Sequence, residues 1–269
     1  MHLFDQAIAL APLAEGRWQG RTSPEYANLV GPYGGILSAC LMNAVLSDPR
    51  AAGDPVSITV NFCAAVPEGG YEIATRQIRA GKYLQHWSVE LVSGGQICTT
   101  ASIILAHRGA DYSHQPVTAP VVPPAGECDL LDMAPMPMGW LHRYDFRFVE
   151  GPPPLSGLPT GGQGPARSVN WVADKPARPL DHLSLTSLSD SFLLRLFHVR
   201  GTLVPMGTVS MTTHFIATCE EIVEQGTAPV LGVADAIRFH GNFHDQHMQL
   251  WSASGKLLAS GTQVVWFKQ

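Results

Sequence analysis

The sequence is organised around one apolar segment, Gly31-Pro-Tyr-Gly-Gly-Ile-Leu-Ser-Ala-Cys-Leu-Met-Asn-Ala-Val-Leu-Ser-Asp-Pro49. After its two adjacent glycines, this segment is apolar on nearly every side for about three helical turns, and only Ser38 and Asn43 interrupt it. A helix that is apolar all round is buried. Because the segment is well short of the ~20 residues that cross a bilayer, we expect protein rather than lipid to surround it.

Segments with strand character follow this helix and are long enough to curl around it. They cover residues 55–64, 71–80, 83–93 and 96–107. Before the helix, the run from Gly16 to Arg21 alternates like an edge strand. The sequence therefore predicts a buried helix wrapped by a meander of strands.

The same order of elements recurs in the second half of the chain. Strands at 143–149 and 167–173 precede a predicted helix over 181–199, for which Asp181 is a suitable cap and Gly201 a suitable stop. Further strand-like segments lie at 206–218, 229–240, 243–252 and 256–267. This recurrence predicts a duplicated small domain, because two copies side by side cover the sheet edge and face that each copy alone leaves exposed.

A proline-rich segment separates the two blocks. Its prolines are Pro116, Pro120, Pro123, Pro124, Pro135 and Pro137. Because proline interrupts regular structure, we divide the chain into an N-terminal unit (1–107), a linker (108–142) and a C-terminal unit (143–269).

The composition excludes several classes of protein. Of the 269 residues, 45% are apolar and 14% are charged, which is too apolar for a disordered chain. No apolar run reaches the length of a membrane span, so we expect no membrane partner. The net charge of -5, without a basic cluster, argues against nucleic acid as a partner.

The cysteines indicate the compartment. They are scattered and odd in number: Cys40, Cys63, Cys98, Cys128 and Cys219. Such cysteines are typical of free thiols in a reducing environment. The N-terminus lacks the basic region and the long apolar core of a signal peptide, so we expect a cytoplasmic protein.

Three segments carry a family resemblance: Tyr33-Gly-Gly-Ile-Leu, Ser57-Ile-Thr-Val-Asn-Phe, and Leu250-Trp-Ser-Ala-Ser-Gly-Lys-Leu-Leu-Ala-Ser-Gly-Thr-Gln263. Together and in this order, they resemble the double hotdog acyl-CoA thioesterases of the acyl-CoA thioesterase II type. The resemblance covers nearly the whole chain and is weakest at 108–142 and 151–180. It implies an α+β fold, a double hotdog in which two copies of a long helix are wrapped by a curved antiparallel sheet.

The resemblance also implies a thioester hydrolase of fatty acid metabolism that acts on acyl-CoA and needs no cofactor and no metal. In this family, an Asp in the second long helix, a Thr or Ser in the next strand and a Gln in the last strand hold the hydrolytic water. Carried onto this sequence, these residues are Asp190, Thr208 and Gln263. Because the sequence around Thr208 departs from the family pattern, Ser210 is the alternative hydroxyl.

The residues themselves also single out Asp190. On a helix over 181–199, it lies in the apolar stripe with Leu183 and Phe197. A buried carboxylate costs several kcal/mol unless it is hydrogen-bonded or its pKa rises, and both are common at catalytic sites. The alternative is that Asp190 caps the chain locally or faces solvent.

Gln263 is a similar anomaly, since it lies on the otherwise apolar face of the last strand with Ala259 and Val265. A buried amide needs partners, and either a water held with Asp190 or a neighbouring backbone carbonyl would serve. Thr208 is less distinctive. By alternation it shares a strand face with Ser210, Thr212 and His214, which is also the pattern of a solvated face.

The first helix carries Met42 and Asn43 where the second carries Asp190, which predicts one reaction centre per chain. The first half would contribute the start of its helix, where the amides after Gly34 and Gly35 lie at the positive end of the helix dipole. We expect the Gly35 amide to polarise the thioester carbonyl, since one such donor is typically worth ~3 to 4 kcal/mol. Alternatively, the glycines only permit close packing.

Arg79 and Lys82 are candidates for binding the coenzyme A phosphates. The histidines His240, His244 and His247 have no further ligands in the sequence that would complete a zinc site, and we expect a surface turn there. A non-catalytic acyl-CoA or acyl-ligand binding protein on the same scaffold is the alternative function, and an enoyl-CoA hydratase is a third. Hotdog proteins commonly pair through sheet edges, so a homo-oligomer is a further expectation.

Overall fold

The structure is a computed structural model that describes residues 1–109, 112–158 and 162–268. Its strands are β1 (Ala11–Ala14), β2 (Arg17–Arg21), β3 (Asp54–Phe62), β4 (Gly70–Ala80), β5 (Leu84–Ser93), β6 (Gln96–Ala106), β7 (Tyr144–Glu150), β8 (Ser168–Asp174), β9 (Met206–Phe215), β10 (Val230–Asp235), β11 (Phe239–His240), β12 (Phe243–Trp251) and β13 (Leu257–Phe267). Its helices are α1 (Leu3–Ala7), α2 (Gly34–Leu46), α3 (His182–Leu188), α4 (Arg195–Arg200) and α5 (Cys219–Gln225), with 3-10 helices η1 (Pro24–Tyr26), η2 (Ala125–Glu127) and η3 (Gly139–Arg143).

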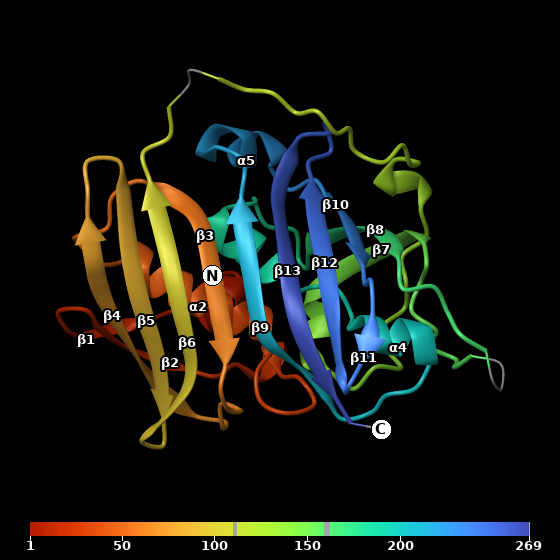
Figure 1. Cartoon of the computed structure of the whole chain (residues 1–269), viewed down its shortest axis with the longest axis horizontal. Helices are drawn as coiled ribbons and strands as arrows, with labels where there is room; N and C mark the ends of the chain where they lie inside the picture. The colour runs from red at the N-terminus through yellow and green to blue at the C-terminus, as the bar shows by residue number, and fades with distance from the viewer. Residues whose placement is uncertain (110–111, 159–161, 269) are drawn as a thin grey trace.

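The strands form one continuous antiparallel sheet. Across the described residues its order is β1-β2-β4-β5-β6-β3-β9-β13-β12-β10-β8-β7, with β11 paired to β12. The two halves of the chain meet where β3 pairs with β9, and the side chains of Thr59 and Thr212 hydrogen-bond there at 2.9 Å. Figure 1 shows the strands side by side with α2 behind them. The sheet edges that the two halves bring to this junction are therefore paired.

Helix α2 is the buried helix that the sequence predicts. Ile36 is 3% exposed, and Leu41 and Val45 are fully buried. The interrupting Ser38 donates a hydrogen bond to the carbonyl of Gly34 at 2.8 Å, so its hydroxyl has a partner. The strands β3 to β6 end within two residues of their predicted bounds, so the prediction for this half is confirmed.

The predicted helix over 181–199 is wrong as a single helix. The chain forms α3, then a turn that contains Asp190, and then α4. Side chains in the turn compete with the helical backbone: the Ser189 hydroxyl donates to the carbonyl of Thr186 at 2.7 Å. The backbone also tightens, because the amide of Asp190 bonds the carbonyl of Ser187 instead of continuing the α-helical pattern. Asp190 therefore lies beyond the helix end, where its direction is no longer set by helical periodicity.

The segment between β6 and β7 contains the short helices η2 and η3 and no strand within its described residues, 107–109 and 112–143. The chain thus lacks sheet structure over most of the predicted linker. The division into units 1–107, 108–142 and 143–269 stays a prediction. No helix among the described residues is both long enough and apolar enough to cross a membrane.

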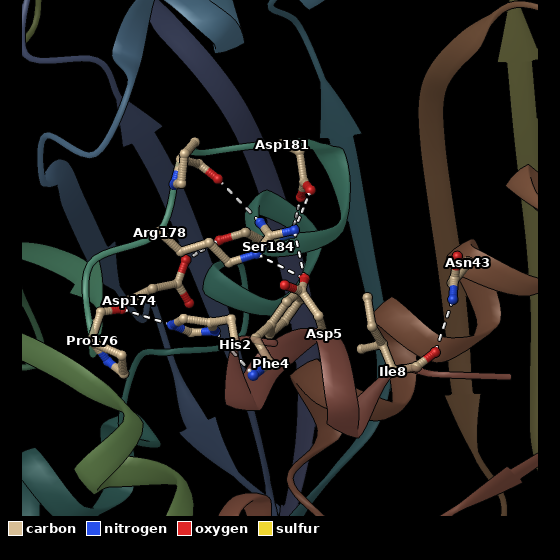
Figure 2. A network of polar contacts seen from close by, with 11 residues as sticks. His2, Phe4, Asp5, Ile8, Asn43, Asp174, Pro176, Arg178, Asp181 and Ser184 are labelled. Carbon is tan, nitrogen blue, oxygen red and sulfur yellow. Dashed lines mark hydrogen bonds and ion pairs between the residues drawn. The ribbon is translucent and has the colours of Figure 1, made fainter.

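The N-terminal segment ties the two halves together, as Figure 2 shows. The Arg178 guanidinium contacts the carboxylates of Asp5 at 2.9 Å and Asp181 at 2.6 Å, and it lies over the Phe4 ring at 4.9 Å. The Asn43 side chain of α2 donates to the carbonyl of Ile8 at 2.8 Å. Asn43 is thus engaged by the chain's own N-terminal segment.

Candidate active site

The centre of the site is a hydrogen bond between Asp190 and Gln263. The Nε2 of Gln263 donates to Oδ1 of Asp190 at 2.8 Å, and Gln263 is 2% exposed while Asp190 is 9% exposed. Gln263 lies on β13, and Asp190 lies in the turn after α3. The structure therefore brings together two residues that are 73 positions apart in the sequence.

Burial sets the protonation behaviour of Asp190. Desolvation raises the pKa of its carboxyl group to about 7, while hydrogen bonds from the Gln263 side chain and the Gly35 backbone amide act in the opposite direction by favouring the ionised form. Near neutral pH, both the acid and the carboxylate are therefore populated. A carboxyl group in this state is suited to accept and return a proton.

The glycines at the start of α2 make room for this carboxylate. A Cβ atom on Gly34 would lie 2.8 Å from Oδ2 of Asp190, and one on Gly35 would lie 2.5 Å from the backbone oxygen of Ser187. The Gly35 backbone amide lies near enough to the Asp190 carboxyl group to favour its ionised form, as expected at the positive end of the α2 dipole. The close contacts around both glycines agree with the packing interpretation. The role of the Gly35 amide as a donor to the substrate carbonyl stays a prediction. The Gly35 N–H lies near Asp190, so a substrate carbonyl would compete with the Asp190 carboxylate for this donor.

Thr208 lies at the site because of an irregularity in the sheet. Its hydroxyl donates to Oε1 of Gln263 at 3.2 Å. Strict alternation would place it on the same face as Ser210, but β9 and β13 shift register between Val264 and Val265, so Val209 is an extra residue. Ser210 points to the other face and donates to Oδ1 of Asn61 at 3.0 Å. The structure thus brings Thr208, and not Ser210, to Gln263.

Gln246 is a site residue that the sequence analysis missed. It lies directly opposite Gln263 in the pairing of β12 with β13, and its Nε2 lies 3.5 Å from Oε1 of Gln263. The sequence carries only a weak signal for it. Gln246 shares the inward face of β12 with His244 and Met248, so it does not interrupt an apolar face as Gln263 does on β13.

The candidates for phosphate binding lie elsewhere. Arg79 lines a groove of about 600 Å³ on the outer face of the N-terminal half, together with His86, Ser88 and Thr100. The Lys82 ammonium lies 5.0 Å from the centre of the Tyr83 ring, in the turn between β4 and β5. Because β5, β6 and β3 separate β4 from β9, the structure does not bring either residue to Asp190.

The histidines near the β11 turn do not all lie on the surface. His244 is 2% exposed and packs against the Phe239 ring, which corrects the expectation of a wholly exposed turn for this residue. Alternation explains the difference, because neighbouring strand residues face opposite ways. Within residues 1–109, 112–158 and 162–268, no group of three or more His, Cys, Asp or Glu side chains could hold a metal ion.

Comparison with known proteins identifies the fold and the family signature. A model of the acyl-CoA thioesterase N-terminal domain matches residues 23–106, and a model of the acyl-CoA thioesterase C-terminal domain matches residues 119–267. No curated protein matches the chain.

Solved structures match over the full length. A conserved protein of unknown function with a hot dog fold from Alicyclobacillus acidocaldarius is 35% identical, with a TM-score of 0.93, covering 100% of this chain and 99% of that one. An acyl-CoA thioesterase II from Mycobacterium marinum is 16% identical, with a TM-score of 0.74 and 98% of each chain covered. The α+β double hotdog fold expected from the sequence is confirmed.

Proposed function

Because the chain belongs to the acyl-CoA thioesterase family, we propose that it hydrolyses an acyl-CoA thioester to a carboxylic acid and free coenzyme A at Asp190, Thr208 and Gln263. The observation that carries the proposal is the hydrogen bond of 2.8 Å between the Gln263 amide and the buried Asp190 carboxylate. A structural role alone would not require an ionisable group there, whereas a group whose pKa is raised to about 7 suits proton transfer.

In the proposed reaction, ionised Asp190 removes a proton from a water molecule as the water oxygen bonds the thioester carbon. The C–S bond of the tetrahedral intermediate then breaks, and the proton on Asp190 passes to the departing thiolate. Gln263 already donates to Asp190 and accepts from Thr208. The direct contacts to the water would therefore come from the second oxygen of Asp190 and a free lone pair of the Thr208 hydroxyl.

Gly35 keeps its proposed role as the donor to the carbonyl oxygen, with one change. In the structure its amide lies near the Asp190 carboxylate and favours the ionised form. When Asp190 takes the proton from water, the attraction between this amide and the carboxyl group weakens, because a charged acceptor binds a donor more strongly than a neutral one. The amide then becomes available at the moment when negative charge develops on the carbonyl oxygen.

Hydrolysis of a panel of acyl-CoA esters of increasing chain length tests this function. We expect the wild-type protein to release free thiol from at least one member of the panel at a rate well above spontaneous hydrolysis. Binding of the esters, measured by calorimetry, without thiol release would instead indicate the non-catalytic binding protein. Loss of enoyl-CoA absorbance without thiol release would indicate a hydratase.

The rate should also depend on pH. Because Asp190 must be ionised to act as a base, kcat/KM is expected to rise about tenfold per pH unit below a midpoint near 7 and to level off above it. The measurement is the initial rate for the best acyl-CoA substrate across about four pH units, with protein stability checked at each pH. A flat profile over this range would exclude Asp190 as the general base.

A further inference from the structure

A line of hydrogen bonds continues from the site into the protein. The backbone amide of Arg195 donates to Oε1 of Gln246 at 3.2 Å, and Nε2 of Gln246 lies 3.5 Å from Oε1 of Gln263. Gln263 in turn donates to Asp190. Gln246 is 1% exposed and lies in the middle of this series of hydrogen bonds. We call the series from the Arg195 backbone amide through Gln246 and Gln263 to Asp190 the amide chain.

The two ends of the amide chain fix its direction. A backbone N–H can only donate, so Oε1 of Gln246 must face Arg195 and its NH₂ group must face Gln263. An ionised carboxylate can only accept, so the NH₂ group of Gln263 must face Asp190. With the Gln263 amide turned over, its oxygen would face the carboxylate and its NH₂ group would face that of Gln246. Thr208 cannot decide between these orientations, since a hydroxyl both donates and accepts.

The Arg195 residue, whose backbone amide begins the amide chain, is held in place by several hydrogen bonds. Arg195 is 1% exposed, and its guanidinium donates to the Ser168 hydroxyl at 2.7 Å, to the carbonyl of Ala166 at 3.3 Å and to the carbonyl of Leu193 at 3.0 Å. The side chain of Arg195 thus holds this residue between β8 and the segment that joins Asp190 to α4. A fixed donor gives the amide chain a fixed polarity.

We propose that Gln246 is a positioning residue that holds the Gln263 amide in the orientation in which its NH₂ group faces Asp190. This inference rests on the proposed function, because it concerns the residues that would hold the water and its base. Gln246 itself contacts neither the water nor the thioester in this scheme. It acts through Gln263, and hydrogen bonds in such a chain strengthen one another.

The pKa of Asp190 depends on whether the NH₂ group of Gln263 faces it, so this pKa reports the positioning role of Gln246. Gln263 and the Gly35 amide do not titrate. The titratable groups that face Asp190 are the phenols of Tyr33, next to α2, and of Tyr144 on β7. Burial raises the pKa of both phenols well above their ordinary value, so they stay neutral at and below neutral pH. A change in the midpoint of the pH profile would therefore belong to Asp190.

Gln246→Met and Gln246→Glu test the proposal. Methionine keeps the length of the side chain and removes the donor, so we expect kcat at neutral pH to fall about tenfold, KM to change less than about twofold, and the midpoint to rise by about 0.5 to 1 pH unit. An ionised glutamate offers acceptors only and would turn the Gln263 amide over, so this variant is compared with the wild type at a pH above the midpoint of both carboxyl groups. We therefore expect a larger loss, of about 100-fold.

Gln225→Met is the matched control. Gln225 is also a buried glutamine, 7% exposed, and its amide donates to the carbonyls of Ala228 and Pro229 at 2.9 and 2.8 Å. It lies at the end of α5, outside the amide chain. This variant should lose thermal stability to a similar degree as Gln246→Met while its kcat and pH midpoint stay at the wild-type values.

A titration of the Asp190 carboxyl carbon by NMR separates this proposal from the proposed function. If the wild type releases no thiol from any ester, but Gln246→Met still raises the Asp190 midpoint, the function fails and the positioning role stands. If the midpoint is the same in wild type and Gln246→Met, the positioning role is overturned, even when kcat falls.

Discussion

Asp190→Asn is expected to lower kcat for acyl-CoA hydrolysis by about 10² to 10⁴-fold, which is the range that a general base contributes. Asparagine keeps the size of the side chain but cannot take the proton from water. Because the substitution leaves the shape of the site unchanged, KM should change little. The measurement is thiol release under saturating substrate, with wild type and variant assayed side by side. Equal rates in the two proteins would remove Asp190 from the mechanism.

The same variant should show a characteristic dependence of stability on pH. Burial raises the pKa of Asp190 from 3.8 to about 7, so the folded state binds a proton more tightly than the unfolded state does. The wild type therefore loses stability as pH rises from the unfolded pKa through the folded one, whereas the neutral asparagine of the variant does not titrate and escapes this loss. The melting temperature of Asp190→Asn relative to wild type should increase between acidic pH and about pH 8. A difference that does not change with pH would contradict burial of an ionisable group at this position.

Gly34→Ala is expected to lower kcat by about tenfold or more while the protein stays folded. The added Cβ would lie 2.8 Å from Oδ2 of Asp190 and 3.1 Å from the Phe62 ring. Both neighbours are side-chain atoms, so the carboxylate can move away, but its geometry relative to Thr208 and the water is then lost. Measuring kcat and the melting temperature on the same sample tests whether the rate falls while the protein stays folded.

Two other glycines provide the comparison. Gly126→Ala is the matched control, because no heavy atom lies within 4 Å of its added Cβ, and both rate and stability should stay unchanged. In Gly35→Ala, the Cβ would lie 2.5 Å from the backbone oxygen of Ser187, which cannot move without parting α2 from α3. That variant should therefore lose stability by about 1 to 3 kcal/mol. If Gly34→Ala kept wild-type kcat, the carboxylate would not need the position seen in the structure.

Periodicity and composition already determined much of this protein. The apolar run from Gly34 to Leu46 specifies a buried helix, and alternation specifies the strands around it, because both patterns depend on residues close together in the chain. The recurrence of the pattern indicated two similar halves. Gln263 stood out as a polar residue on the otherwise apolar face of the last strand. Asp190 was found from the family resemblance, because the helical stripe on which the sequence placed it ends at Leu188.

The tertiary structure decided how these residues meet. The register shift that turns Thr208 inward and the approach of Gly34 to Asp190 depend on partners far away in the sequence. Gln246 belongs to the site because the register of β12 against β13 places it opposite Gln263. A strand's own sequence does not fix its register or its bulges, because these follow from the hydrogen bonds and packing of the strands on either side.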